Sequence, residues 1–276
     1  MSSNKFYKER TNTMFLNQFK MSGHPFQEST PVEWILKDPR ISQSLARLEY
    51  FSQQGTLALV IGQTGVGKST LLRLFIQKLS RNRYRPVYLH FTGINSTALL
   101  RLIVAQLGES PRRGKDALFL QILDRTRNGD LTTILIIDEA HLIDPRALTD
   151  LRLLVSSAVD TNIPLKIILS GQESLARILD CASLRDLVNR ITVRSHLVAL
   201  TKDQSVSYID YRMQCAGSNE KVFEPEAKTL IHDYASGIPR QINNIATACL
   251  LNAAARNLNK INESLVTDTM AEFHLP

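Results

Sequence analysis

Hydrophobic and polar positions follow two alternating patterns between residues 56 and 200. Short, nearly continuous apolar runs indicate strands buried on both faces, and stretches with apolar residues three and four apart indicate helices that bury one side. The predicted strands are residues 56–61, 86–91, 131–137, 165–169 and 191–197. The predicted helices are residues 69–79, 96–106, 116–127, 145–158 and 173–179, with Ser96 as candidate N-cap. This alternation predicts an α/β fold with a parallel sheet.

The pattern changes on both sides of this region. Residues 1–55 are polar and interrupted by Pro25, Pro31 and Pro39, apart from a predicted helix over residues 41–51. After residue 200 the strand pattern stops, and the predicted elements are helices over residues 202–216, 224–234, 239–257 and 263–271. We therefore expect three parts: an N-terminal segment (1–55) that packs on an α/β core (56–200), and a small all-α domain (201–276).

The composition excludes several classes of protein. Hydrophobic residues make up 43% and charged residues 21% of the 276 residues, which is ordinary for a globular enzyme. The three cysteines, at positions 181, 215 and 249, are too widely spaced for a zinc site or a disulfide framework. Residues 1–10 contain no signal-peptide core, and no apolar run reaches the roughly 18 residues of a membrane span. The sequence therefore predicts a soluble, cytoplasmic protein.

A glycine-rich motif lies between the first predicted strand and the helix after it. Residues 62–69 read Gly-Gln-Thr-Gly-Val-Gly-Lys-Ser, which fits the pattern of a P-loop, or Walker A motif. Such a loop surrounds phosphates with backbone N–H groups at a helix N-terminus. Lys68 should neutralise the β- and γ-phosphates of ATP, and Ser69 should ligate Mg²⁺. The predicted nucleotide-binding residues are Gly62, Gln63, Thr64, Gly65, Val66, Gly67, Lys68, Ser69 and Thr70.

Two carboxylates follow the apolar residues of the third predicted strand, as in a Walker B motif: residues 134–139 read Ile-Leu-Ile-Ile-Asp-Glu. Open α/β sheets place ligands at the carboxyl ends of their strands. Asp138 should hold Mg²⁺, directly or through water, and Glu139 should orient or deprotonate the attacking water. Ser170 closes the next strand and is the candidate contact to the γ-phosphate or the water, with Gln172 as the alternative. The predicted chemistry is ATP hydrolysis.

His141 completes the sequence Asp-Glu-Ala-His, which one group of helicases shares. The chain shows no other helicase signature. We therefore interpret His141 as a residue at the exit of the strand rather than as a catalyst.

The order of these motifs resembles that of AAA+ ATPases, in which Walker A, Walker B, a polar strand end and a helical lid follow one another. More narrowly, the chain resembles the ExeA-like (GspA-like) group and transposon-encoded regulators of the TnsC, TniB and MuB type. The segments that carry this resemblance are residues 14–16, 25–26, 137–142, 151–154, 169–175, 189–191 and 237–243. The resemblance implies an AAA+ P-loop sheet sandwiched by helices, followed by a small all-α lid.

The resemblance also implies roles for two arginines. Arg240, in Gly-Ile-Pro-Arg, matches the lid arginine called sensor 2, which reaches the γ-phosphate of its own subunit's ATP. Arg190, in Asn-Arg-Ile, matches the arginine finger that reaches the ATP of a neighbouring subunit, and Arg185 is the alternative. An ATP-dependent ring or helical oligomer follows from these roles.

Two functions fit this resemblance. ExeA-type secretion proteins continue into a membrane span and a periplasmic portion, whereas this sequence ends at Pro276 with neither. We therefore expect a regulator of DNA transposition, which selects targets and recruits a transposase, with no membrane partner. A secretion-assembly ATPase is the alternative. An ATP-gated signalling switch that binds no DNA is a third possibility.

The net charge of +7 is concentrated between the two nucleotide motifs. Residues 71–130 hold eleven Lys and Arg against four Asp and Glu, which equals the excess of the whole chain. Such a strip favours a sequence-independent contact with the phosphates of double-stranded DNA. The predicted DNA contacts are Arg101, Arg112, Arg113 and Lys115. A solubilising surface is the alternative interpretation, above all for Arg81, Arg83 and Arg85.

Overall fold

The computed structural model describes residues 15–28, 30–90, 93–218 and 221–273. Within these residues the chain forms two compact units, each with a hydrophobic core of its own. The sheet unit comprises residues 39–64 and 68–198. The helical unit comprises the described parts of residues 1–38, 65–67 and 199–276.

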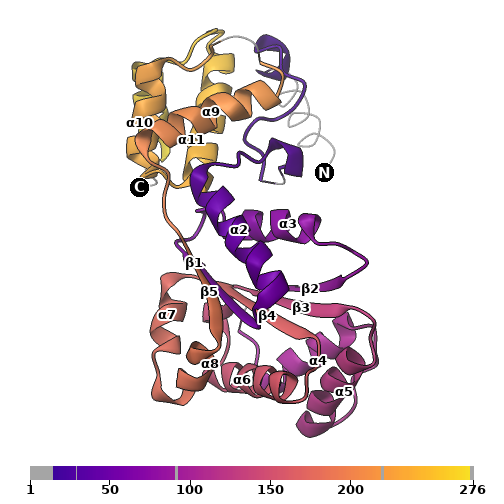
Figure 1. The fold of residues 1–276 in the computed structure, drawn as a ribbon. Coiled ribbons are helices and arrows are strands. Elements are labelled where there is room, and N and C mark those ends of the chain that lie inside the picture. The colour runs from indigo at the N-terminus through magenta and orange to yellow at the C-terminus, as the bar shows by residue number, and fades with distance from the viewer. Residues whose placement is uncertain (1–14, 29, 91–92, 219–220, 274–276) are drawn as a thin grey trace, which may run out of the picture. The chain divides into compact units, whose positions relative to one another are not determined.

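The described part of the sheet unit contains a five-stranded parallel sheet with the strand order β2-β3-β4-β1-β5 (Figure 1). The strands are β1 Leu57–Gly62, β2 Tyr84–His90, β3 Thr132–Asp138, β4 Leu165–Gly171 and β5 Ile191–Leu197. Neighbouring strands pair in parallel, with His90 opposite Asp138 and Ile137 opposite Leu169, so their carboxyl ends lie at one edge. The predicted parallel sheet is confirmed, although residue 91, the predicted end of the second strand, lies outside the described residues.

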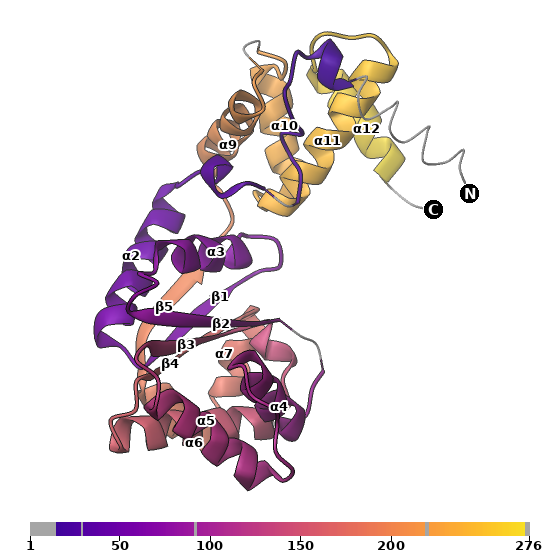
Figure 2. The ribbon, with the colours of Figure 1, turned by 90° about the vertical axis from the view of Figure 1, so that its right-hand side faces the viewer.

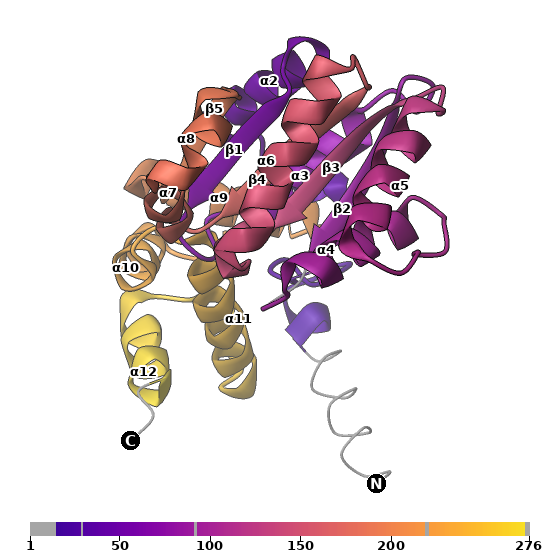
Figure 3. The same ribbon diagram turned by 90° about the horizontal axis from the view of Figure 1, so that it is seen from below.

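Helices cover both faces of this sheet (Figure 2). One face carries α2 Pro39–Gln54 and α3 Lys68–Lys78. The other carries α4 Ser96–Gln106, α5 Lys115–Arg127, α6 Pro145–Asp160, α7 Glu173–Leu179 and α8 Arg185–Asn189, with the short 3₁₀ turns η2 Ala140–Leu142 and η3 Ala182–Leu184. Seen from this face, α6 crosses the middle of the sheet, α5 lies towards β2, and α7 and α8 lie towards β5 (Figure 3).

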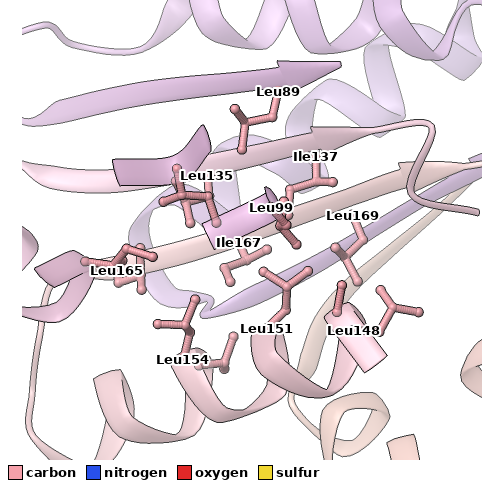
Figure 4. Packing of buried hydrophobic residues seen from close by; sticks show 14 of the residues in the cluster. Leu89, Leu99, Leu135, Ile137, Leu148, Leu151, Leu154, Leu165, Ile167 and Leu169 are labelled. Carbon is pink, nitrogen blue, oxygen red and sulfur yellow. The ribbon is translucent and has the colours of Figure 1, made fainter. Parts of the chain in front are cut away.

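One part of the core of the sheet unit lies between the sheet and α6 (Figure 4). The apolar residues of β3 and β4 that point to this face meet one side of α6, where leucines recur at helical spacing. The labelled residues include Leu135, Ile137, Leu148, Leu151, Leu154, Ile167 and Leu169, each of which is at most 1% exposed. Fully burying one such side chain contributes about 1.5–3 kcal/mol, so this layer fixes where the strands end and holds the site in place.

The N-cap of α4 differs from the prediction by one residue. Asn95, not Ser96, has the extended backbone of a cap (φ −80°, ψ 167°), and its side chain accepts a hydrogen bond from the Ala98 amide (2.9 Å). The Ser96 hydroxyl donates instead to Asp150 of α6. Asparagine and serine are both good N-caps. Here Ser96 is held by Asp150, and Asn95 takes the cap position.

The helical unit confirms the predicted change to an all-α pattern after residue 200. Its helices are α9 Lys202–Cys215, α10 Pro225–Ala235, α11 Pro239–Ala255 and α12 Glu263–Phe273, together with the 3₁₀ turn η1 Val32–Trp34. A capping box starts α9: Thr201 accepts from the Gln204 amide (3.3 Å), and Gln204 accepts from the Thr201 amide (3.0 Å). These bonds satisfy amide groups that the first helical turn leaves without partners.

The N-terminal segment is grouped differently from our expectation that residues 1–55 pack on the α/β core. The described residues between 15 and 38 belong to the helical unit, and α2 belongs to the sheet unit. The segment's apolar side chains are buried in the core of the C-terminal helices; they are Phe15, Phe19, Met21 and Phe26. Arg212 of α9 fixes the segment by donating to the Pro25 carbonyl (2.6 Å). Residues 1–14 lie outside the described residues.

Among the residues that the structure describes, no helix combines the length and the apolar character that a bilayer crossing requires.

Candidate nucleotide-binding site

The P-loop connects the end of β1 to the start of α3. Gly65 and Gly67 have φ angles of +84° and +111°, which residues with a Cβ rarely adopt. α3 begins at Lys68, so the unpaired amides of its first turn are available where the loop ends. The sequence therefore needs glycine at these positions in order to present backbone N–H groups to an anion.

Lys68 and its neighbours occupy different environments in this loop. The Lys68 side chain is buried, and its Nζ donates to the carbonyls of Gly62 (2.9 Å) and Gln63 (3.0 Å). Val66 is also buried, so we expect this residue to contribute to binding only through its backbone. Gln63 and Thr64 are exposed, and Thr70 is half-buried. Phosphate binding by these residues stays a prediction.

Asp138, at the end of β3, is the centre of the site. The residue is fully buried, and each carboxylate oxygen accepts two hydrogen bonds. Oδ2 accepts from Ser69 Oγ (2.8 Å) and Tyr88 Oη (2.6 Å), while Oδ1 accepts from Ser170 Oγ (2.8 Å) and the Glu139 amide (3.0 Å). The structure thus brings together Walker A, Walker B and the end of β4, as the sequence predicted.

These hydrogen bonds keep the Asp138 carboxylate charged. Burial alone would raise the pKa of Asp138, but the donors around it outweigh burial, so the pKa of this carboxyl lies below its ordinary value. Burial and the bond to Asp138 raise the pKa of the Tyr88 hydroxyl, which therefore stays a donor at neutral pH. A buried carboxylate beside a serine hydroxyl at the helix start suits Mg²⁺, which commonly takes one or two protein ligands plus phosphate oxygens.

The described residues contain no group of three or more His, Cys, Asp and Glu side chains that could hold a metal by themselves. That Ser69 and Asp138 share an ion with a nucleotide stays a prediction. Their arrangement fits that use, because the Ser69 hydroxyl and one oxygen of Asp138 lie 2.8 Å apart.

Among the residues beside Asp138, sequence reasoning missed His90, whose Nδ1 lies 3.9 Å from Oδ2, and above all Tyr88. Tyr88 lies on β2, opposite Ile136 of β3, and is 38% exposed although its hydroxyl reaches Asp138. Sequence periodicity shows that β2 is a strand but does not show that β2 pairs with β3. The sequence therefore contains no pattern that would place Tyr88 beside Asp138.

Ser170 and Gln172 were alternatives for the polar contact at the end of β4. The Ser170 hydroxyl is fully buried and points to Asp138, while the Gln172 backbone amide lies 3.4 Å from Nδ1 of His141. Ser170 is therefore the residue that the structure places in the Asp138 cluster. A contact with the γ-phosphate or the lytic water stays a prediction.

The three arginines outside this cluster lie on element ends. Arg190 is half-buried and caps α8, and Arg185 is the exposed first residue of the same helix. Neither forms an ion pair with another described residue, so a structural salt bridge is not what holds them in the described part of the chain. Arg240 is exposed in the first turn of α11 in the helical unit. Their nucleotide contacts stay predictions.

The local fold around Arg240 explains its motif. Gly237 has φ +68°, and its carbonyl accepts from the Leu200 amide (2.8 Å). A Cβ at Gly237 would collide with the Leu200 carbonyl oxygen. Pro239 then occupies the first turn of α11, where its missing N–H costs no hydrogen bond. Gly-Ile-Pro-Arg therefore sets the start of α11 and hence the position of Arg240.

The basic residues between the two motifs include an ordered loop, residues 107–114, that runs along α5. Gln121 of α5 is buried and holds this loop: its Nε2 donates to Glu109 (2.8 Å) and to the Ser110 carbonyl (3.0 Å), and its Oε1 accepts from the Arg112 amide (3.2 Å). The side chains of Arg112 and Arg113 remain exposed and form no ion pair within the described residues.

Lys115 differs from these arginines. Its Nζ lies 2.7 Å from Oδ1 of Asp150, a buried residue of α6 that also accepts from Ser96. The ammonium thus joins the start of α5 to α4 and α6. A contact of Lys115 with DNA stays a prediction, since its side chain is 46% exposed beside this ion pair. Arg101 is exposed on α4 without a described ion pair, as a phosphate contact requires.

Comparison with known protein families agrees with this geometry. A family model described as an AAA domain matches residues 52–179, which contain the P-loop, Asp138, Glu139 and Ser170. Residues 52–179 are thus similar to an AAA domain. The strand order and the flanking helices are those of a P-loop AAA+ fold.

A curated relative extends the similarity beyond this domain. General secretion pathway protein A of Aeromonas hydrophila is 32% identical over 256 residues, which cover 90% of this chain and 46% of that protein. The chain thus spans about half the length of this relative. Over this length the chain is similar to general secretion pathway protein A.

Solved structures show the same fold at low identity. Cdc6p from Pyrobaculum aerophilum has a TM-score of 0.72 at 21% identity and covers 90% of this chain and 70% of its own. The Aeropyrum pernix ORC1 protein, solved in complex with DNA, has a TM-score of 0.70 at 17% identity and covers 90% of this chain and 68% of its own.

Proposed function

We propose that this chain is an ATP- and Mg²⁺-dependent AAA+ ATPase that oligomerises on double-stranded DNA and regulates transposition by recruiting a transposase to its target. The observation that carries the proposal is the loop 107–114, where Gln121 orders the backbone while Arg112 and Arg113 stay exposed and unpaired. A cytoplasmic location goes with this proposal.

The nucleotide site supplies the chemistry of the proposal. Lys68 and the P-loop amides would neutralise phosphate charge, and Ser69 and Asp138 would hold a Mg²⁺ ion, which would supply further positive charge to the reacting phosphate. Glu139 orients or deprotonates the attacking water. Phosphoryl transfer depends mainly on positioning and charge neutralisation, and these are the contributions that one subunit makes by itself.

Residues outside this cluster complete the proposal. Arg190, or Arg185 as the alternative, reaches the nucleotide of a neighbouring subunit, and Arg240 reports the nucleotide state to the helical unit. An arginine finger raises turnover by about 10³–10⁵ in proteins that use one. Oligomerisation and hydrolysis are thereby coupled, and hydrolysis disassembles the oligomer.

Duplex DNA is favoured over single-stranded nucleic acid by the kind of residues in the loop 107–114. The segment is rich in arginine but its exposed residues include no aromatic side chain, so stacking on unpaired bases is not its mode of binding. Arginines contact phosphates without reading base sequence, which suits a regulator that acts at many target sites.

The substitution Arg113→Ala tests the loop. It should weaken binding to duplexes of different sequence by the same factor and reduce the slope of log K against log salt by about one unit. The matched control is Arg81→Ala, which removes an exposed arginine of the same basic segment and should leave the slope unchanged. Equal slopes for Arg113→Ala and the unmodified protein would contradict the proposal.

A second candidate function is assembly of a secretion apparatus. The observation that favours it is the 32% identity to general secretion pathway protein A, which extends over 90% of this chain. This candidate predicts ATP turnover that duplex DNA does not change, whereas the DNA-based proposal predicts turnover and oligomerisation that respond to DNA.

A further inference from the structure

His141 lies between two parts of the nucleotide site that are far apart in sequence. It belongs to η2, directly after the Walker B carboxylates, and its side chain is only 7% exposed. Nδ1 lies 3.3 Å from Oε2 of Glu139 and 3.4 Å from the backbone nitrogen of Gln172 in the turn from β4 to α7. The ring thus connects the catalytic carboxylate to the end of the neighbouring strand.

The glycine at the end of β4 makes room for this ring. A Cβ at Gly171 would lie 3.2 Å from the His141 amide nitrogen and 3.3 Å from its Nδ1, closer than nearly all real Cβ contacts. It would also lie 3.0 Å from the side chain of Leu175. Packing therefore holds the imidazole in a single place rather than leaving it free at the surface.

The two neighbours of Nδ1 make opposite demands on it. A backbone amide needs an acceptor, whereas a carboxylate needs a donor, and one ring nitrogen cannot be both at once. A bond to a charged carboxylate is roughly twice as strong as a bond between neutral groups. The arrangement in which Nδ1–H donates to Glu139 is therefore the more stable one. The Gln172 amide becomes the partner of Nδ1 only when the carboxylate turns away.

Glu139 has few other constraints on its carboxylate. Its backbone is fixed, because its φ is +54° and its amide donates to Asp138 (3.0 Å). Its side chain is 22% exposed, so its remaining freedom is rotation about its own bonds. A general base must lie within hydrogen-bond reach of the proton that it removes, which makes this rotation decisive for turnover.

We propose that His141 is a positioning residue that donates from Nδ1 to Glu139 Oε2 and so orients the carboxylate that activates water. The other oxygen, Oε1, is left to accept the proton. When the carboxylate turns away, the same nitrogen can instead accept from the Gln172 amide in the turn after β4. The inference rests on ATP hydrolysis by this site and not on DNA binding.

Two substitutions at His141 separate the donor from the volume of the side chain. His141→Leu fills a similar space without a donor and should lower kcat about tenfold while KM for ATP stays within twofold, because the change acts on the Glu139 carboxylate and not on the P-loop. His141→Asn restores a donor near the Nδ1 position and should recover kcat to within about threefold of the unmodified protein. His196→Leu is the control. His196 also pairs with a glutamate, Glu173 (3.2 Å), but this pair is exposed, and kcat should not change.

A double-mutant cycle gives a readout that a structural role would not produce. In a Glu139→Gln background, His141→Leu should cause no further loss of kcat, because both changes act through one carboxylate. The melting temperature of each variant is measured alongside. Unchanged kcat in His141→Leu, an equal loss in His141→Asn, or a full additional loss in the Glu139→Gln background would each overturn the proposal.

An inactive parent protein that still binds and oligomerises would instead count against the proposed hydrolysis itself. The unmodified protein is therefore assayed first, by its release of phosphate from ATP. Failure of the proposed function then shows in the parent, whereas failure of the His141 inference shows only in the comparison of variants.

Discussion

Substituting Asp138 tests whether the four donors around it hold the site together as well as prepare it for a cation. Asp138→Ala would leave the Ser170 hydroxyl and the Glu139 amide without an acceptor, and neither can turn easily to water. An unsatisfied buried donor costs about 1–3 kcal/mol, so the free energy of unfolding should fall by about 3 kcal/mol. Ser69 is exposed and Tyr88 is partly exposed, so water can accept the hydrogen bonds that their hydroxyls would no longer donate to Asp138.

Asp138→Asn is the matched variant. Its amide oxygen can accept from Ser170 and from the Glu139 amide, while the hydroxyls of Ser69 and Tyr88 can rotate to accept from its NH₂ group. The free energy of unfolding should therefore stay within about 1 kcal/mol of the unmodified protein. Both variants should lose ATP turnover by about two orders of magnitude, since the charge that holds the cation is gone.

Urea denaturation followed by circular dichroism measures the free energy of unfolding, and phosphate release from ATP measures turnover. The account requires both variants to be inactive and only Asp138→Ala to be clearly destabilised. Equal stability of the two variants would refute the view that the carboxylate satisfies buried donors. Normal turnover in Asp138→Asn would refute its role towards the cation.

Three other predictions concern hydrolysis, subunit contacts and the helical unit. Glu139→Gln should bind nucleotide normally but trap the nucleotide-bound oligomer, as seen by size-exclusion chromatography with ATP, and normal turnover in that variant would contradict the role of Glu139. Arg190→Ala should lower turnover by about 10³-fold without changing nucleotide affinity, and doping it into unmodified protein should lower activity more than in proportion; if only Arg185→Ala behaves so, the finger is Arg185. Gly237→Ala should lower the free energy of unfolding by about 2–4 kcal/mol through its positive φ and its collision with a carbonyl, whereas Gly114→Ala, with φ +94° and open space around it, should cost about 1 kcal/mol.

Much of the fold follows from local patterns in the sequence. Buried parallel strands and amphipathic helices have distinct periods, so the elements from residue 56 onward were predicted to within a few residues. α8 was missed because five residues are too few to show a helical period. The N-cap of α4 was misplaced by one position because Asn95 and Ser96 are both good caps.

The parts of the site that lie within one motif were also predictable, whereas contacts between elements were not. The P-loop and the Walker B pair carry their own spacing, and Ser170 was placed by its position at a strand end. Tyr88 reaches Asp138 only because β2 lies beside β3, and Lys115 reaches Asp150 only because α5 starts near α6. Local sequence patterns do not predict that β2 lies beside β3 or that α5 starts near α6.

The N-terminal segment shows the same limit. Its phenylalanines indicate that it packs on something, but the sequence does not say on which part. The C-terminal helices offer the apolar surface that buries Phe15 and Phe26, and the segment belongs to their core.

The central claim is that nucleotide state controls binding to duplex DNA. The most direct test is fluorescence anisotropy of a labelled duplex, titrated with the protein and Mg²⁺ in the presence of either a non-hydrolysable ATP analogue or ADP. The account predicts saturable binding with the analogue, for duplexes of any sequence, and at least tenfold weaker binding with ADP. Absence of binding with the analogue, or equal binding with both nucleotides, would contradict it.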